Sequence, residues 1–102
     1  MEKNRETYRV QVGCFKSPFS PFRPVVIARI CEMIVQIKKC ADTDCVIYED
    51  GSVTYVYLSP VFQYAEDARR ECKSIYEKCG FPSFSKPADQ VKGKVVTEKY
   101  AI

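Results

Sequence analysis

Apolar and polar residues alternate along the segment "TYRVQVGCF" at residues 7–15. Strict alternation is typical of a β-strand with one buried face. It divides the segment into an apolar and a polar side: Tyr8, Val10 and Val12 against Arg9, Gln11 and Gly13. A glutamine between two valines therefore predicts a strand whose second face either meets water or binds something.

Two later segments show the periodicity of amphipathic helices. The first begins near Pro24 and ends around Ala41, with an apolar stripe of Ile27, Ile30, Cys31, Ile34, Ile37 and Ala41. The second is "VFQYAEDARRECKSIYEKCGFP" at residues 61–82, with an inner stripe of Ala65, Ala68, Cys72, Ile75 and Cys79. Early acidic residues and the final glycine and proline suit the start and stop of this helix.

Three further strands are predicted between and after the helices. "DTDCVIYED" and "SVTYVYLSP" are strand-like runs on either side of Asp50-Gly51, a strong hairpin signal. The second run places Tyr55 and Tyr57 on the side opposite Val56 and Leu58. "PSFSKP" at residues 82–87 supplies a short fourth strand.

The predicted order is β-α-β-β-α-β, an α+β two-layer sandwich of the ferredoxin-like or RNP-like type. Each helix has a single apolar stripe, so both must cover the same face of an antiparallel sheet. We call the opposite face the distal face and expect it to be open, with Arg9, Gln11, Tyr55 and Tyr57 pointing to solvent. One domain is expected over residues 1–102, with its core at about 7–87 and residues 88–102 as a tail or extra edge strand.

The chain also contains a weak internal repeat. "YRVQVGCF" and "TYVYLSPVF" are each followed by a helix and a strand, so the sequence reads as two β-α-β halves. Gln11 and Tyr57 occupy matching places in these halves.

Composition leaves the class of partner open. A hydrophobic fraction of 46% and a charged fraction of 28% are those of an ordinary globular protein. The net charge of +3 is below that of a dedicated nucleic-acid binder. We find no apolar run long enough to span a bilayer and no signal peptide. The expected location is the cytoplasm for a complete protein, or the cell envelope for a part of a longer exported chain.

Six cysteines allow disulfides, but several fall on helix stripes, so we expect mostly reduced core thiols. Their spacing and the lack of histidine disfavour zinc, and no metal or cofactor is expected. The segment "KSPFSPFRP" at residues 16–24 is interpreted as an ordered connector, with a proline-rich docking segment as the alternative.

The segments "YRVQVGCF" and "DGSVTYVYLSPVFQYAEDARRECKSIYEKCGFP" resemble the SPOR domain (sporulation-related repeat), a bacterial peptidoglycan-binding module. The resemblance covers about Thr7 to Pro87. It implies a sheet that binds glycan strands stripped of their stem peptides. The family's strand glutamine falls on Gln11, and its small polar residue three places later falls on Cys14. The long proline-rich loop and Ser59 before Pro60 depart from the family pattern.

The residue types of the distal face suit a saccharide. Gln11 offers two donors and an acceptor, Tyr55 and Tyr57 offer flat amphipathic rings, and Arg9 can pair with a carboxylate. The same residues can also be ordinary strand residues that face water.

Two rival binding functions remain open. They are RNA recognition by exposed aromatics, and protein interaction or dimerisation through the sheet face or edge. Nucleic acid is the less favoured partner, because the third strand lacks the basic-Gly-aromatic signature of RNA-recognition modules. We expect no enzymatic activity, since the sequence offers neither a histidine nor a nucleophile with a paired base.

Overall fold

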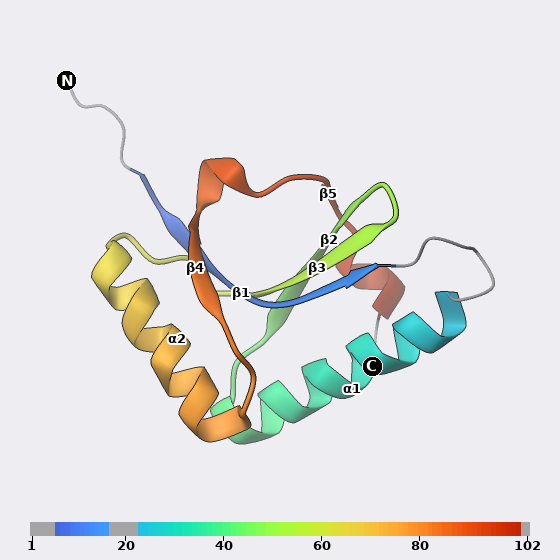
Figure 1. Cartoon of the computed structure of the whole chain (residues 1–102), viewed down its shortest axis with the longest axis horizontal. Helices are drawn as coiled ribbons and strands as arrows, with labels where there is room; N and C mark the ends of the chain where they lie inside the picture. The colour runs from blue at the N-terminus through green and yellow to red at the C-terminus, as the bar shows by residue number, and fades with distance from the viewer. Residues whose placement is uncertain (1–5, 17–22, 101–102) are drawn as a thin grey trace.

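Two helices and a five-stranded antiparallel sheet make up the fold, as the sequence predicts (Figure 1). The computed structural model describes residues 6–16 and 23–100. The sheet has the strand order β4-β1-β3-β2-β5. The elements are β1 (Tyr8–Lys16), α1 (Arg23–Ala41), β2 (Cys45–Asp50), β3 (Val53–Leu58), α2 (Ala65–Cys79), β4 (Phe84–Pro87), the 3-10 helix η2 (Ala88–Gln90), β5 (Lys94–Val95) and the 3-10 helix η3 (Thr97–Tyr100).

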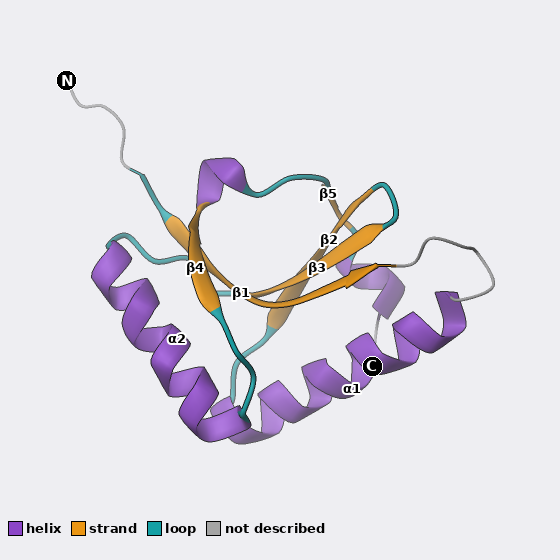
Figure 2. Cartoon of the chain, viewed as in Figure 1, coloured by secondary structure: helices purple, strands orange, loops and turns teal. Residues whose placement is uncertain are grey.

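Both helices lie on the same side of the sheet (Figure 2). The core between the two layers contains fully buried residues of the sheet and of both helices: Val10, Ile47, Val56, Leu58, Ile30, Ile37, Ala68 and Ile75. Met33 is buried on α1, although the sequence interpretation left it out of the stripe. Burial of these side chains supplies the main driving force for folding.

A β-bulge interrupts the pairing of β1 with β3. Gln11 pairs with Tyr57, but Gly13 pairs with the next residue, Val56, so Val12 is the extra residue. A Cβ added at Gly13 would lie 2.9 Å from the Met33 sulfur, so Gly13 faces the helices. The alternation rule, which placed Gly13 beside Gln11, is wrong here because the bulge shifts the strand by one residue.

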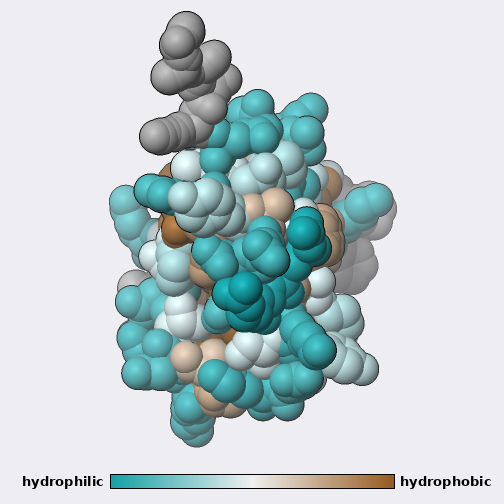
Figure 3. All heavy atoms as spheres, turned by 90° about the vertical axis from the view of Figure 1, so that its left-hand side faces the viewer, coloured by the Kyte–Doolittle hydropathy of each residue, from teal (hydrophilic) through white to brown (hydrophobic). Residues whose placement is uncertain are grey.

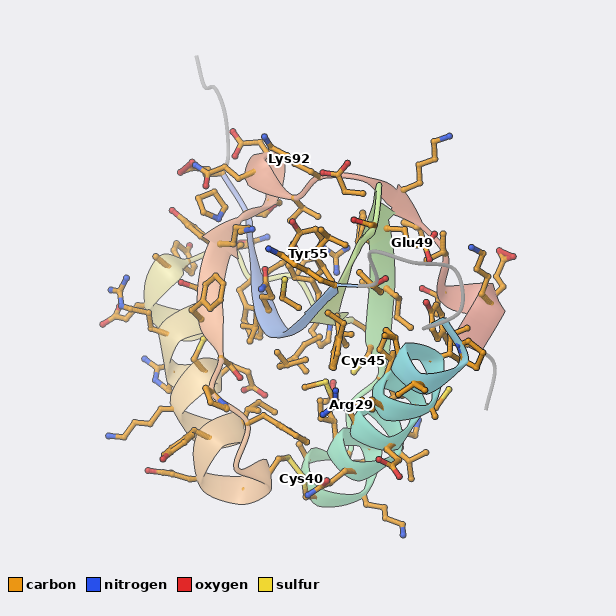
Figure 4. All side chains as sticks on the ribbon, turned by 45° about the vertical axis from the view of Figure 1, so that its right-hand side comes forward. Arg29, Cys40, Cys45, Glu49, Tyr55 and Lys92 are labelled. Carbon is orange, nitrogen blue, oxygen red and sulfur yellow. A yellow bond between two sulfur atoms is a disulfide. The ribbon has the colours of Figure 1, made fainter. Side chains whose placement is uncertain are left out.

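A disulfide joins the C-terminal ends of the two helices. It links Cys40 of α1 to Cys79 of α2, with their Cα atoms 5.8 Å apart (Figure 4). The other four cysteines, Cys14, Cys31, Cys45 and Cys72, are free. Burial raises the pKa of the Cys45 thiol to about 12, and the neighbouring Asp44 carboxylate adds to the rise. Most of the cysteines are therefore thiols, but the expectation did not foresee the bond between the helices.

The chain from β4 to β5 crosses the sheet on its distal side. Because these strands form opposite edges, the connection Ala88–Gly93, which we call the strap, must pass from one edge to the other. Figure 1 shows it on the side away from the helices. The expectation of a fully open distal face is thus wrong, because the strap crosses it. The sequence alone gave no sign that residues 88–93 return over this face.

Hydrogen bonds hold the strap at both edges. Ala88 N donates to Thr7 O at 2.8 Å beside β1. At the far edge, Val96 N donates to Ile47 O at 2.8 Å, and Ile47 N donates to Thr97 Oγ1 at 3.0 Å. The final residues extend this anchor, because Lys99 pairs with Glu49 and Tyr100 is buried.

Three further predictions concern the proline-rich segment, membrane spans and metal sites. Most of the proline-rich segment, residues 17–22, lies outside the described residues. Within the described ranges, no helix has the length and apolar character needed to cross a membrane. The same ranges contain no cluster of potential metal-ligating side chains.

Candidate functional site

The five residues proposed from the sequence share the distal face. On β1 and β3, Gln11 lies opposite Tyr57, and Cys14 lies opposite Tyr55. Arg9 precedes Gln11 by two positions and so shares its side of the strand. Cys14, three positions after Gln11, reaches the same face only because the bulge adds one residue.

Three further residues join this face that sequence reasoning missed. Tyr48 of β2 lies opposite Tyr55, while Lys86 and Phe84 of β4 lie opposite Arg9 and Gln11. The two-residue hairpin loop could have identified Tyr48, because it fixes the register of β2 against β3. No comparable signal existed for β4, since no short turn joins it to β1.

Three tyrosines form a cluster at the centre of the distal face. The ring centroid of Tyr57 lies 5.5 Å from that of Tyr48 in an edge-on arrangement, and 6.2 Å from that of Tyr55 in a stacked one. In Figure 4, Tyr55 lies on the side of the sheet toward strap residue Lys92, away from Arg29 on α1. Tyr57 is therefore the middle member of the cluster.

Gln11 and Tyr57 are buried rather than exposed. Gln11 is 6% exposed and Tyr57 is 0% exposed. The prediction that both point to solvent is therefore wrong, and the rings of Tyr48 and Tyr55 pack on either side of the Tyr57 ring. The ring of Tyr57 thus offers no flat surface for a sugar or base to stack on, whereas Tyr55 stays partly exposed.

The two buried side chains carry polar atoms that lack hydrogen-bond partners within residues 6–16 and 23–100. These atoms are Gln11 Oε1 and the Tyr57 hydroxyl oxygen. Such atoms are rare in folded proteins because each costs roughly 1–3 kcal/mol. Burial, with smaller contributions from Tyr55, Tyr48 and Cys14, raises the pKa of Tyr57 to about 12. At neutral pH the Tyr57 hydroxyl is protonated, as an unshifted phenol would also be, and is able to donate.

Two cations lie over the tyrosine rings. The Arg9 guanidinium carbon is 6.0 Å from the Tyr48 centroid, and Lys86 Nζ is 5.4 Å from the Tyr55 centroid. Arg9 Nη1 also donates to the backbone oxygens of Leu58 at 3.3 Å and Ser59 at 3.2 Å. The rings of Tyr48 and Tyr55 therefore each have a cationic side chain over them and are not bare aromatic surfaces.

A further hollow lies on the helix side of the sheet. A cavity of about 550 Å³ between α1, β2 and η3 is lined mainly by apolar side chains, with the Lys38–Asp44 ion pair at its wall. Its thiol, Cys45, is kept protonated by burial. None of the unpartnered polar atoms lies there. The distal face remains the stronger candidate site.

Comparisons with known proteins identify a structural neighbour. No family model and no curated protein matches the chain. Among solved structures, the chain is similar to the peptidoglycan binding domain of the B. subtilis cell wall lytic enzyme CwlC, with a TM-score of 0.57 and 15% identity. The match covers 85% of this chain and 95% of that one. At this identity, the likeness establishes a shared fold.

Proposed function

We propose that this chain is a non-catalytic module that binds peptidoglycan, and that it recognises glycan strands stripped of stem peptides through the distal face. The observation that carries the proposal is a pair of buried polar atoms, Gln11 Oε1 and the Tyr57 hydroxyl, that have no hydrogen-bond partner among the described residues. A fold retains such costly groups where they serve a ligand.

The chemistry of the pair suits sugar hydroxyl and acetamido groups. Gln11 supplies an acceptor oxygen and amide donors, and Tyr57 supplies a hydroxyl that stays protonated. Neighbouring Tyr48 and Tyr55, with Arg9 and Lys86 over their rings, place further amphipathic and polar groups beside this pair. Because Gln11 and Tyr57 are buried in the free protein, the distal face must open locally before a strand can reach their polar atoms.

Two independent likenesses support this function. The opening strand and the second half of the sequence resemble the SPOR domain, and the fold is similar to that of a peptidoglycan binding domain. Gln11, the position carried over from the family, lies at the centre of the distal face. Fold similarity alone would leave the ligand open, so the polar pair carries the greater weight.

The disulfide favours a location in the cell envelope. Disulfides persist in oxidising compartments outside the cytosol. Cys40 and Cys79 are 39 positions apart, and their bond ties together the two helices that cover the sheet. This arrangement fits a module that works at the cell wall, as the proposed ligand requires.

RNA recognition receives less support than glycan binding. Modules that read RNA on a sheet stack bases on exposed aromatic rings. Here the Tyr57 ring is fully buried, and Lys86 lies over the ring of Tyr55. Broad protein docking is also less favoured on the side that carries α2, whose surface is mainly hydrophilic with small apolar patches (Figure 3).

A sedimentation assay with purified sacculi tests the proposal. The protein should pellet with sacculi, and the bound fraction should rise after an amidase removes the stem peptides. Equal or weaker pelleting with the stripped sacculi contradicts the glycan proposal. Salt-dependent binding to single-stranded RNA in the absence of sacculus binding would favour the RNA alternative.

A further inference from the structure

On the basis of the proposed function, we propose that Arg9 and Lys86 form an anion subsite on the distal face. It takes a carboxylate of the bound strand and makes the module select acidic saccharides over neutral ones. The subsite would lie at the edge of the face formed by β1 and β4, next to Gln11.

The two cations are direct neighbours across these strands. Arg9 and Lys86 form a cross-strand pair, so their side chains leave the sheet on the same side. Like charges in this position destabilise a sheet. The arrangement resembles the costly placement of Gln11 and Tyr57, because a bound anion would offset the cost in both cases.

Neither cation has a carboxylate partner within residues 6–16 and 23–100. In the part of the chain that the structure describes, the ion pairs are Lys38–Asp44, Arg70–Asp67 and Lys99–Glu49. Asp89 of the strap follows Lys86 closely in sequence, yet it pairs with neither Lys86 nor Arg9. The positive charge at this edge is therefore available to a ligand.

Aromatic rings and backbone oxygens hold the two cations in place but do not neutralise their charge. The rings of Tyr48 and Tyr55 support the two cations from the sheet side, at 6.0 and 5.4 Å. Arg9 uses only Nη1 to reach the backbone oxygens of Leu58 and Ser59. A guanidinium has five N–H donors, so the remaining ones can bind a carboxylate.

The carboxylate that fits this subsite is the lactyl group of muramic acid. When a stem peptide is attached, this carboxyl group is consumed in an amide bond, and removal of the peptide restores its negative charge. Pairing with Arg9 and Lys86 would therefore favour stripped strands. A chitooligosaccharide has the same type of amino-sugar backbone but lacks the lactyl group, which makes it a neutral control ligand.

The test compares the affinity of the protein for soluble stripped glycan strands and for chitooligosaccharides of equal length. The wild type should bind the stripped strands about tenfold more tightly, which corresponds to one net charge-assisted contact. This preference should shrink as salt rises. Lys86→Gln should reduce it to about threefold or less without changing chitooligosaccharide binding, and Lys86→Glu should abolish it.

Lys94→Gln provides a matched control, because Lys94 is an exposed lysine of the other edge strand, β5. It should keep the wild-type preference. Equal affinity of the wild type for the two saccharides overturns the subsite but leaves glycan binding by the distal face intact. A loss of affinity for both saccharides in Lys86→Gln likewise overturns the charge-specific role. Binding of neither saccharide by the wild type contradicts the proposed function itself.

Discussion

Gln11 and Tyr57 lie directly opposite each other on β1 and β3, at the centre of the distal face. Each holds a buried polar atom that has no hydrogen-bond partner in the part of the chain that the structure describes. Gln11 and Tyr57 occupy matching positions in the two β-α-β halves of the weak internal repeat, so their pairing joins these halves. Groups placed in this way reduce the stability of the free protein. The functional proposal rests on this free-energy cost of burying polar atoms without hydrogen bonds.

Replacing Tyr57 by phenylalanine should separate stability from binding. Removing an unpartnered buried hydroxyl should raise the free energy of unfolding by about 1 kcal/mol, because the desolvation cost is removed. The same change should weaken binding to stripped sacculi at least several-fold. Urea denaturation and sacculus sedimentation measure the two effects.

Tyr76→Phe is the matched control, since Tyr76 is an exposed tyrosine of α2. It should change neither stability nor binding. A destabilisation of Tyr57→Phe by more than about 1 kcal/mol would show that the hydroxyl makes a favourable hydrogen bond in the free protein.

The ionisation of Tyr57 gives a test that needs no ligand. Because the pKa of Tyr57 is raised to about 12, the folded protein keeps this proton after the unfolded chain would lose it near pH 10. Ionisation of Tyr57 therefore leaves the free energy of unfolding unchanged below about pH 10 and lowers it as the pH rises from about 10 to 12. At about pH 10.5, phenolate absorbance should thus be nearly equal in wild type and Tyr57→Phe. Clearly lower phenolate absorbance in Tyr57→Phe than in the wild type would show that Tyr57 ionises normally.

Gly93 should be essential for the anchoring of the strap. Its φ is +94°, and an added Cβ would collide with the backbone oxygen of Glu49. Gly93→Ala should therefore cost more than about 2 kcal/mol of stability, through strain and displacement of β5. Gly51 has φ +64° with open space around it, so Gly51→Ala should cost only about 1 kcal/mol. Equal costs in thermal or urea unfolding would argue against the close approach of the strap to β2.

Removal of the disulfide should lower stability substantially. Cross-linking residues 39 positions apart restricts the unfolded chain by about 4 kcal/mol in the chain-entropy estimate. A Cys40→Ser/Cys79→Ser variant should lose stability of this order, whereas Cys14→Ser, at an exposed free thiol, should lose little. Thiol labelling of the oxidised, unfolded protein should detect the four free cysteines. Six reactive thiols would contradict the bond.

Local patterns were enough to predict the architecture of this chain. The apolar stripes of the two helices and the hairpin signal at Asp50-Gly51 led to the correct α+β sandwich, because each pattern reflects the burial of one side of an element. Alternation failed at Gly13, where a bulge changes the register. The strap was missed because its path depends on the pairing of β5 with β2, a contact between distant residues.

The candidate site was only partly predictable for the same reason. Arg9 and Gln11, like Tyr55 and Tyr57, could be assigned to one face from the pattern of their own strands. Lys86 could not, since its place opposite Arg9 depends on how β4 pairs with β1. Burial of Gln11 and Tyr57 also depends on neighbours that come from several strands. The sequence therefore indicated the face correctly but not the exposure of its central residues.

The most direct test of the account is amide and side-chain NMR of the protein during titration with soluble stripped glycan strands. The account predicts the largest shift changes on the distal face, at the Gln11 side-chain amide and at the backbone amides of Tyr48, Tyr55 and Lys86. Residues on the outer face of α1, such as Glu32 and Gln36, should not respond. Shift changes confined to the helices, with Gln11 unaffected at saturation, would contradict the claim that the distal face binds the strand.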